Sequence, residues 1–286
     1  MLACSLRARP HNRRGLSVAF DLPASKGPIR DLATEAGHTL GFALQAIGAT
    51  VVATLRGRLS LGETLGQVVF IGRVSTGPAL LLMIPVGVFI AVSVGELAGR
   101  IGAGGYSGAV VAFIIVGQAS ALVSALMMAG VAGSAICTDL GSRKIREEVD
   151  AIEVMGLNVI ERLVAPRVAA GIIVSIMLCS LITVVGVGAC YAYHIYVQHL
   201  PAGAFMATFS QYGRMSDFIM ALVKAAVFAL ISTIVACFKG LHARGGPRGV
   251  ADAVNEAVVI AFALVFVFNT VLSQLYTVIV PAVGAY

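Results

Sequence analysis

The chain has 286 residues, of which 58% are hydrophobic and only 12% are charged, and its formal net charge is +6. Soluble domains average about 25% charged residues, so a chain this poor in charge cannot cover a globule with polar surface. The composition excludes an ordinary soluble protein and predicts an all-α integral membrane protein. The 32 glycines fit that class, because small residues let membrane helices pack closely.

The first 36 residues carry six basic side chains but no apolar core of a signal peptide, so they predict a basic cytoplasmic arm. Residues 37–286 form the membrane domain. Its first element, over 39–58, contains the short apolar stretch TLGFALQAIGATVVATL with basic residues on both sides. Because basic residues collect on the cytoplasmic side of membranes, we expect a helix lying at the interface, with a true span as the alternative.

Five later segments each supply the roughly 20 apolar residues that a helix needs to cross a bilayer. The predicted spans are 74–97, 107–137, 163–193, 217–238 and 252–279. With the N-terminus inside, only Arg100, Arg214 and Lys224 of the 20 basic residues fall on or near the outer side. The bias predicts a multi-pass protein of the plasma (inner) membrane, with a cytoplasmic N-terminus and an extracytoplasmic C-terminus.

A charged island, residues 139–167, separates the second and third spans. It holds eleven charged side chains in 29 residues, whereas 101–138 and 168–213 hold none. Each charge would cost about 2.5–3.5 kcal/mol at the centre of a bilayer, so the island must lie outside it. Apolar residues recur in the island at helical spacing: Ile145, Val149, Ile152 and Met155.

This spacing predicts an amphipathic helix over about 141–156, with Gly156 and Asn158 as its stop signal. A helix that lies on lipid favours Lys and Arg. Residues 147–153 are instead acidic, which favours docking to a protein, and a helix on the membrane surface is the alternative.

The stretch AGVAGSAICTDLGSRKIREEVDAIEVMGLNVIERLVAPR, 129–167, resembles the MlaE/YrbE permeases, the membrane subunits of ABC-type lipid transporters. KGLHARGGPRGVADAVNEAVV, 239–259, resembles the YrbE subunits of actinobacterial Mce systems, and the resemblance covers about 35–280. It implies a permease that moves a hydrophobic lipid between the plasma membrane and a tunnel of MCE proteins. The lipid would be of the fatty acid, mycolic acid, sterol or phospholipid class.

The resemblance also implies the partners. They are a cytoplasmic ABC ATPase dimer that binds ATP and Mg, a second YrbE-type permease that is a paralogue, and MCE-domain proteins on the outer side. The island helix would couple to the ATPase through nine residues: Arg143, Arg146, Glu147, Glu148, Asp150, Ile152, Glu153, Met155 and Gly156. The chain departs from the family at GQASALVSAL, 117–126, and at Val131, where many members carry charged residues.

No GxxxxGK[ST] motif, metal-ligand spacing or catalytic constellation occurs. The sequence therefore predicts a non-catalytic subunit that binds no cofactor and no nucleic acid, with ATP hydrolysis on a partner chain. Ion-driven secondary transport, an intramembrane enzyme and a structural membrane subunit are the alternatives. The first usually shows a carboxylate at mid-span or internal repeats, and neither is visible.

Small residues recur at every fourth position of the second span, including Ala125, Ala129 and Gly133. They predict a packing face, within the chain or between two permeases. Two charged residues mark a candidate lipid path. Lys224 is more simply explained by snorkelling toward the interface, whereas an exposed loop acid explains Glu96 as well as a lipid entry site does.

Overall fold

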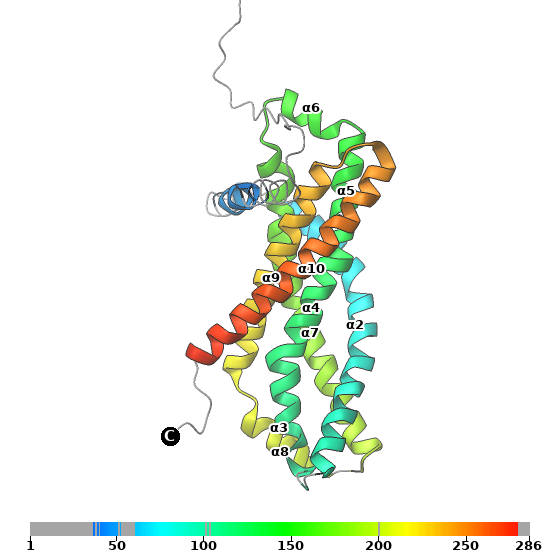
Figure 1. The fold of residues 1–286 in the computed structure, drawn as a ribbon, viewed down its shortest axis with the longest axis vertical. Helices are drawn as coiled ribbons and strands as arrows, with labels where there is room; N and C mark the ends of the chain where they lie inside the picture. The colour runs from blue at the N-terminus through cyan, green and yellow to red at the C-terminus, as the bar shows by residue number, and fades with distance from the viewer. Residues whose placement is uncertain are drawn as a thin grey trace, which may run out of the picture. The chain divides into compact units, whose positions relative to one another are not determined.

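The computed structural model describes Gly37, Thr39, residues 41–50, Val52, and the ranges 61–100, 104–199 and 201–279, together with Gly102. Every regular element among these residues is a helix (Figure 1). Five helices are long and apolar enough to span a membrane: Gly62–Arg100, Gly104–Ile145, Ile160–Tyr196, Met215–Leu241 and Gly246–Val278. The all-α fold with five candidate spans is therefore confirmed. The predicted basic arm lies outside the described residues.

The first span belongs to α2 (Leu61–Arg100), which begins well before the predicted start at residue 74. Its extra turns remain helical because they pack on the protein, with Ile71 fully buried. Pro78 and Pro85 lie inside the helix. Membrane helices tolerate such prolines because neighbouring groups satisfy the backbone carbonyls that they free.

The second span is one continuous rod in which π-helical turns alternate with α-helix. After the 3₁₀ turn η1 (Gly104–Tyr106), α3 (Ser107–Val111), α4 (Ser120–Met127) and α5 (Gly133–Ile145) are joined by the π-helices η2 (Ala112–Ala119) and η3 (Met128–Ala132). Wider π turns are often found at functional sites, and they change which side chains share a face.

The rest of the chain comprises α6 (Glu148–Val154), η4 (Ile160–Val164), α7 (Ala165–Tyr196), α8 (Ala202–Tyr212), α9 (Met215–Leu241) and α10 (Gly246–Ile279). The helices α6 and α8 lie at opposite ends of the long helices (Figure 1), which we call the α6 end and the α8 end. The sequence did not predict α8, which is too short to span a membrane. It packs so closely that a Cβ on Gly108 would lie 2.3 Å from the Phe205 carbonyl oxygen.

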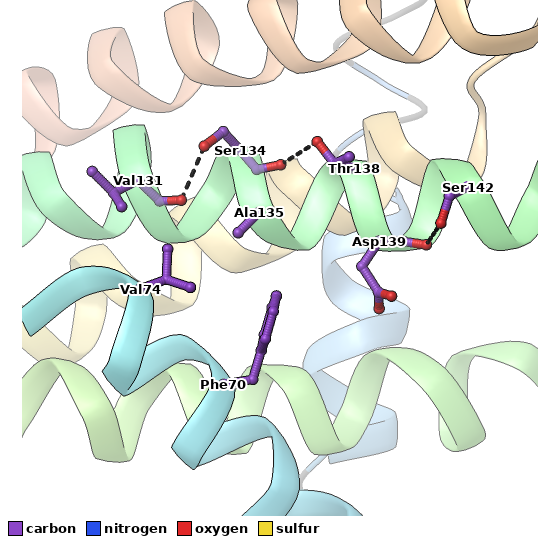
Figure 2. A pocket seen from close by; sticks show the side chains of 8 residues that line it. All are labelled: Phe70, Val74, Val131, Ser134, Ala135, Thr138, Asp139 and Ser142. Carbon is purple, nitrogen blue, oxygen red and sulfur yellow. Dashed lines mark hydrogen bonds between the residues drawn. The ribbon is translucent and has the colours of Figure 1, made fainter.

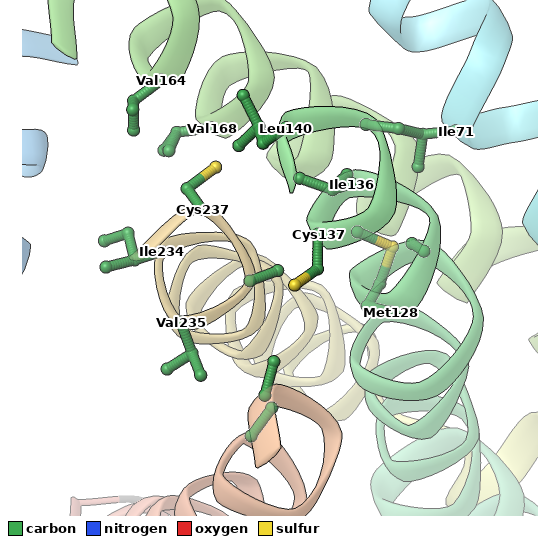
Figure 3. Packing of buried hydrophobic residues seen from close by; sticks show 14 of the residues in the cluster. Ile71, Met128, Ile136, Cys137, Leu140, Val164, Val168, Ile234, Val235 and Cys237 are labelled. Carbon is green, nitrogen blue, oxygen red and sulfur yellow. The ribbon is translucent and has the colours of Figure 1, made fainter. Parts of the chain in front are cut away.

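The largest hydrophobic cluster lies toward the α6 end, where α5, α7, α9 and α10 meet. Figure 3 shows Cys237 of α9 pointing toward Val168 of α7, with Leu140 of α5 beside them. The most apolar stretch is 50% buried in each of the second, third and fourth spans, but only 22% in the first and 11% in the fifth. Hence α2 and α10 present most of the surface that remains for lipid or other subunits.

A helical segment, residues 41–50, packs against this cluster through fully buried Ala46 and through Phe42. The ring of Phe42 lies 5.4 Å from that of Phe238. The segment is seen nearly end-on in Figure 1, so it crosses the long helices instead of running along them. Residues 53–58 of the predicted interfacial helix lie outside the described residues.

Candidate coupling and lipid-handling sites

An ion pair joins the first and the last residue of the charged island. Arg167 at the start of α7 is 1% exposed, and its Nη2 lies 2.5 Å from Oδ2 of Asp139 in α5. Its Nη1 donates to the Leu163 carbonyl at 2.7 Å. Because breaking a buried ion pair is costly, this contact holds the ends of the second and third spans together. Asp139 and Arg167 lie 28 residues apart, and no sequence pattern indicates that they pair.

The helix predicted over 141–156 is interrupted in the structure, which corrects that expectation. The α5 helix ends at Ile145, and α6 runs only from Glu148 to Val154. Glu147 between them has φ of 61°, in the left-handed region that non-glycine residues rarely adopt. The break turns α6 away from the axis of α5 (Figure 1).

The most exposed apolar side chains of this region lie at the end of α6 and just after it. Val154 is 88% exposed, Met155 66% and Leu157 51%. Val149 is buried in the main cluster, and Ile152 packs partly against it. The predicted apolar face of Ile145, Val149, Ile152 and Met155 is therefore divided. Val149 and Ile152 fix α6 to the protein, whereas Ile145, which is 43% exposed, and Met155 face outward.

Several of the predicted acidic contacts are engaged within the island. Asp150 pairs with Lys144, and Glu148 accepts a hydrogen bond from Arg146 Nε at 2.8 Å. Within the described residues neither Glu147 nor Glu153 forms an ion pair, and both are exposed. These two carboxylates are the ones most free to meet a basic partner. Arg143 instead faces Asp139, with 3.4 Å between Nε and Oδ1.

The island ends in a defined turn. Gly156 adopts φ of 76°, and its N–H donates to the Glu153 carbonyl at 2.9 Å. Asn158 then caps the next helix, because its side-chain oxygen accepts the Ile160 N–H at 3.0 Å. The expected stop at these two residues is confirmed, and it fixes how Met155 and Leu157 are presented.

A groove of about 480 Å³ lies between α2 and α5 near the island (Figure 2). Phe70 and Val74 form one wall, and the other is lined by Val131, Ser134, Ala135, Thr138, Asp139 and Ser142. The three hydroxyls donate to carbonyls of their own helix at 2.8–2.9 Å. They therefore offer acceptor oxygens but no free donor, on a wall that is otherwise mainly apolar.

The small-residue stripe of the second span packs inside the chain. Ala125 is fully buried against Phe228 and Val265, and Ala129 is 1% exposed. A Cβ on Gly133 would lie 3.3 Å from the Met128 carbonyl oxygen and 3.8 Å from Cβ of Ala236. Of the two expectations for these residues, the contacts support helix packing within one chain.

Lys224 does not snorkel, so the simpler sequence expectation for it is wrong. It is 1% exposed. Its Nζ donates to Oε1 of Gln118 in η2 at 3.2 Å and to Oγ of Ser273 in α10 at 2.9 Å. Three spans therefore meet at one buried ammonium group. Glu96, the other predicted lipid-path residue, is exposed near the end of α2.

None of the described residues form a cluster of His, Cys, Asp or Glu that could hold a metal ion. The polar groups that meet at Lys224 are its own ammonium group, the Gln118 amide and the Ser273 hydroxyl. This arrangement suits helix packing and ligand binding.

Comparisons with known proteins agree with this geometry. The family described as Permease MlaE matches residues 64–275, which is most of the chain. A probable ABC transporter permease protein of Rickettsia typhi is 29% identical over 245 residues, 83% of this chain and 94% of the relative. A probable ABC transporter permease protein of Synechocystis is 27% identical over 245 residues, covering 83% and 93%.

A plant protein is also similar. The chloroplastic protein TRIGALACTOSYLDIACYLGLYCEROL 1 of Arabidopsis thaliana is 27% identical over 229 residues, 80% of this chain and 65% of the relative. The family match includes all five candidate spans in whole or in large part, together with the island between the second and the third. The chain therefore belongs to the MlaE family of ABC transporter permeases.

Proposed function

We propose that this chain is the permease subunit of an ATP-driven lipid transporter of the Mce type, with the role of a YrbE subunit. As an ABC permease it is a non-catalytic membrane component, and a separate ATPase supplies the energy. The observation that carries the proposal is the island: a short helix held rigidly between two spans, with apolar side chains facing outward.

The island has the mechanics of a coupling element. Val149 and Ile152 anchor α6 in the main cluster, and Asp139 with Arg167 ties α5 to α7. A displacement of α6 by a partner would therefore move two spans together, because packed cores transmit strain. Val154 and Met155 would fill a groove on the ATPase, with Glu147 and Glu153 at its rim.

A lipid cargo fits the rest of the chain. The name of the Arabidopsis relative contains that of a galactolipid, trigalactosyldiacylglycerol. The groove between α2 and α5 has a volume of about 480 Å³ and is lined mainly by apolar atoms, which suits an acyl chain. Low polarity within the spans suits such a cargo better than an ion.

The transporter would hold two permease chains, because one chain offers one island and an ABC engine has two ATPase subunits. The small-residue stripe is used within the chain, so α2 and α10 are the surfaces left for a second permease, which we expect to be a paralogue. MCE-domain proteins would sit at the α8 end. Glu96 lies near that end and could line the path of the lipid.

In the proposed orientation, the α6 end lies on the cytoplasmic side of the plasma membrane and the α8 end lies on the outer side. Single cysteines at Val154 and at Val278, 88% and 80% exposed, report the two ends of the bundle. In intact cells an impermeant thiol reagent should label the cysteine at 278 and spare the one at 154. The reverse pattern contradicts the orientation.

The function itself is tested by reconstitution. The chain is purified with the ATPase that co-purifies, placed in vesicles with fluorescent lipid, and given ATP or a non-hydrolysable analogue. We expect lipid transfer only with ATP. A purified chain that retains no ATPase, or transfer driven by an ion gradient alone, contradicts the proposal.

A further inference from the structure

Lys224 is a buried cation without a counter-ion among the residues that the structure describes. The side chain is 1% exposed, and both of its hydrogen-bond acceptors, Gln118 and Ser273, are neutral. No described carboxylate forms an ion pair with it. The Ser273 hydroxyl also faces Gln118 Oε1 at 3.4 Å, so the two acceptors are engaged with each other as well.

The depth of Lys224 in the membrane makes the lack of a counter-ion unusual. It lies nine residues into α9, which starts at Met215 and has 27 residues. At 1.5 Å per residue it is about 14 Å from the α8 end of a helix about 40 Å long. The ammonium group therefore lies within the hydrocarbon layer, where an isolated charge is expensive and usually functional.

The three hydrogen-bonding side chains leave one donor unused. An ammonium group has three N–H donors, and two of them are accounted for. Gln118 and Ser273 are only half-buried, so the cluster reaches the surface between η2 and α10. On the same stretch of α10, Val271 and Leu275 are 56% and 50% exposed. A charged group with an apolar tail could thus meet Lys224 from the α10 side.

We propose that Lys224 binds the anionic headgroup of the cargo lipid, a carboxylate or a phosphate, while the acyl chain lies along the apolar surface of α10. The inference rests on the proposed function and narrows its substrate to acidic lipids, which sets sterols aside. Soluble anions do not enter the hydrocarbon layer, whereas a lipid brings its own anion to this depth. Charge-assisted hydrogen bonds are the stronger kind, and they gain strength where water is excluded.

The test compares lipids that differ only in charge. The permease assembly, purified with its ATPase, is equilibrated in detergent with oleate or with oleyl alcohol, and retained lipid is measured by mass spectrometry. Phosphatidic acid and diacylglycerol form a second pair that carries the phosphate. The wild type should retain the acidic member about tenfold or more over the neutral one, since a hydrogen bond to a charged group is worth that much.

Three variants locate the effect. Lys224→Met should reduce the ratio to near one while oleyl alcohol binding, which reports folding, stays unchanged. Gln118→Glu places a carboxylate beside the ammonium group and should also remove the preference. Arg214→Met, which deletes a different basic residue at the start of α9, should keep the wild-type ratio.

Each remaining outcome overturns the inference. A wild-type ratio near one, or a ratio that survives Lys224→Met, excludes Lys224 as the anion site. If Lys224→Met instead releases the second permease chain and the wild type shows no preference, a subunit carboxylate is the counter-ion. ATPase retention and ATP-driven transfer are measured separately on the wild type, so a failure of the Lys224 inference is distinct from a failure of the proposed function.

Discussion

Arg167 and Lys224 are both 1% exposed, yet their surroundings differ in kind. Arg167, at the α6 end, meets the carboxylate of Asp139 at 2.5 Å. Lys224, deeper in the spans, meets only an amide and a hydroxyl. A buried charge that carries its own counter-ion serves the fold, whereas one that lacks it is available to a ligand. The need of a buried charge for a counter-ion thus separates a structural site from a candidate binding site.

Removing the counter-ion of Arg167 should cause the largest loss of stability. Asp139→Asn leaves an uncompensated buried guanidinium, so the free energy of unfolding should fall by about 3–5 kcal/mol. Thermal unfolding of the purified assembly measures the loss. The double variant Asp139→Asn with Arg167→Met removes both charges and should recover much of it. Equal instability of the single and the double variant contradicts this role for the pair.

Overpacking of the second span should have the next largest effect. Ala129→Leu adds volume where the structure has none to spare, at a cost of about 1–3 kcal/mol. Val184→Leu, at a position that is 71% exposed, is the matched control and should be nearly neutral. The melting temperatures of the two variants in detergent test the expected difference in stability. If Ala129→Leu is as stable as the control, that stripe does not pack within the chain.

The two buried cations should differ when each is replaced by methionine. Lys224→Met should hardly change the free energy of unfolding in lipid-free detergent. Methionine fills similar space without a charge, and replacing buried charges by apolar residues is often neutral or stabilising. Arg167→Met should by contrast destabilise the protein, because it removes the hydrogen bonds to Asp139 and to the Leu163 carbonyl and leaves Asp139 only its longer contact with Arg143. Chemical denaturation of both variants under the same conditions tests the contrast. A loss for Lys224→Met as large as that for Arg167→Met would erase the distinction.

The smallest effect is expected at the exposed surface of the island. Glu148→Gln removes an ion pair with Arg146 whose side chains are 45% and 60% exposed. Exposed pairs contribute about 0.2–1 kcal/mol, and salt screens them further. ATPase retention should weaken slightly, more at low salt than at high salt. A complete loss of the ATPase from this single change would show that Glu148 is a central contact.

The sequence predicted the five spans because hydropathy and segment length decide membrane insertion locally. It also predicted the turn at Gly156, since glycine and asparagine mark helix ends. The break at Glu147 was missed because a glutamate with positive φ has no sequence signal. The burial of Lys224 was missed because its acceptors lie 106 and 49 residues away in the chain. The groove beside Phe70 likewise depends on two helices that are distant in sequence.

The central claim is that a separate ATPase grips the island through side chains that the structure leaves exposed. The most direct test replaces Val154 and Met155 together by alanine, since Ile152 is partly occupied by the protein's own core. Met206 and Met215, exposed near the α8 end, are replaced together as the matched control. Large apolar residues at interface centres dominate binding, so the first double variant should lose the ATPase on purification or uncouple its hydrolysis from lipid. The control should retain both properties. Full ATPase retention and lipid-stimulated hydrolysis in the Val154 and Met155 variant would contradict the account.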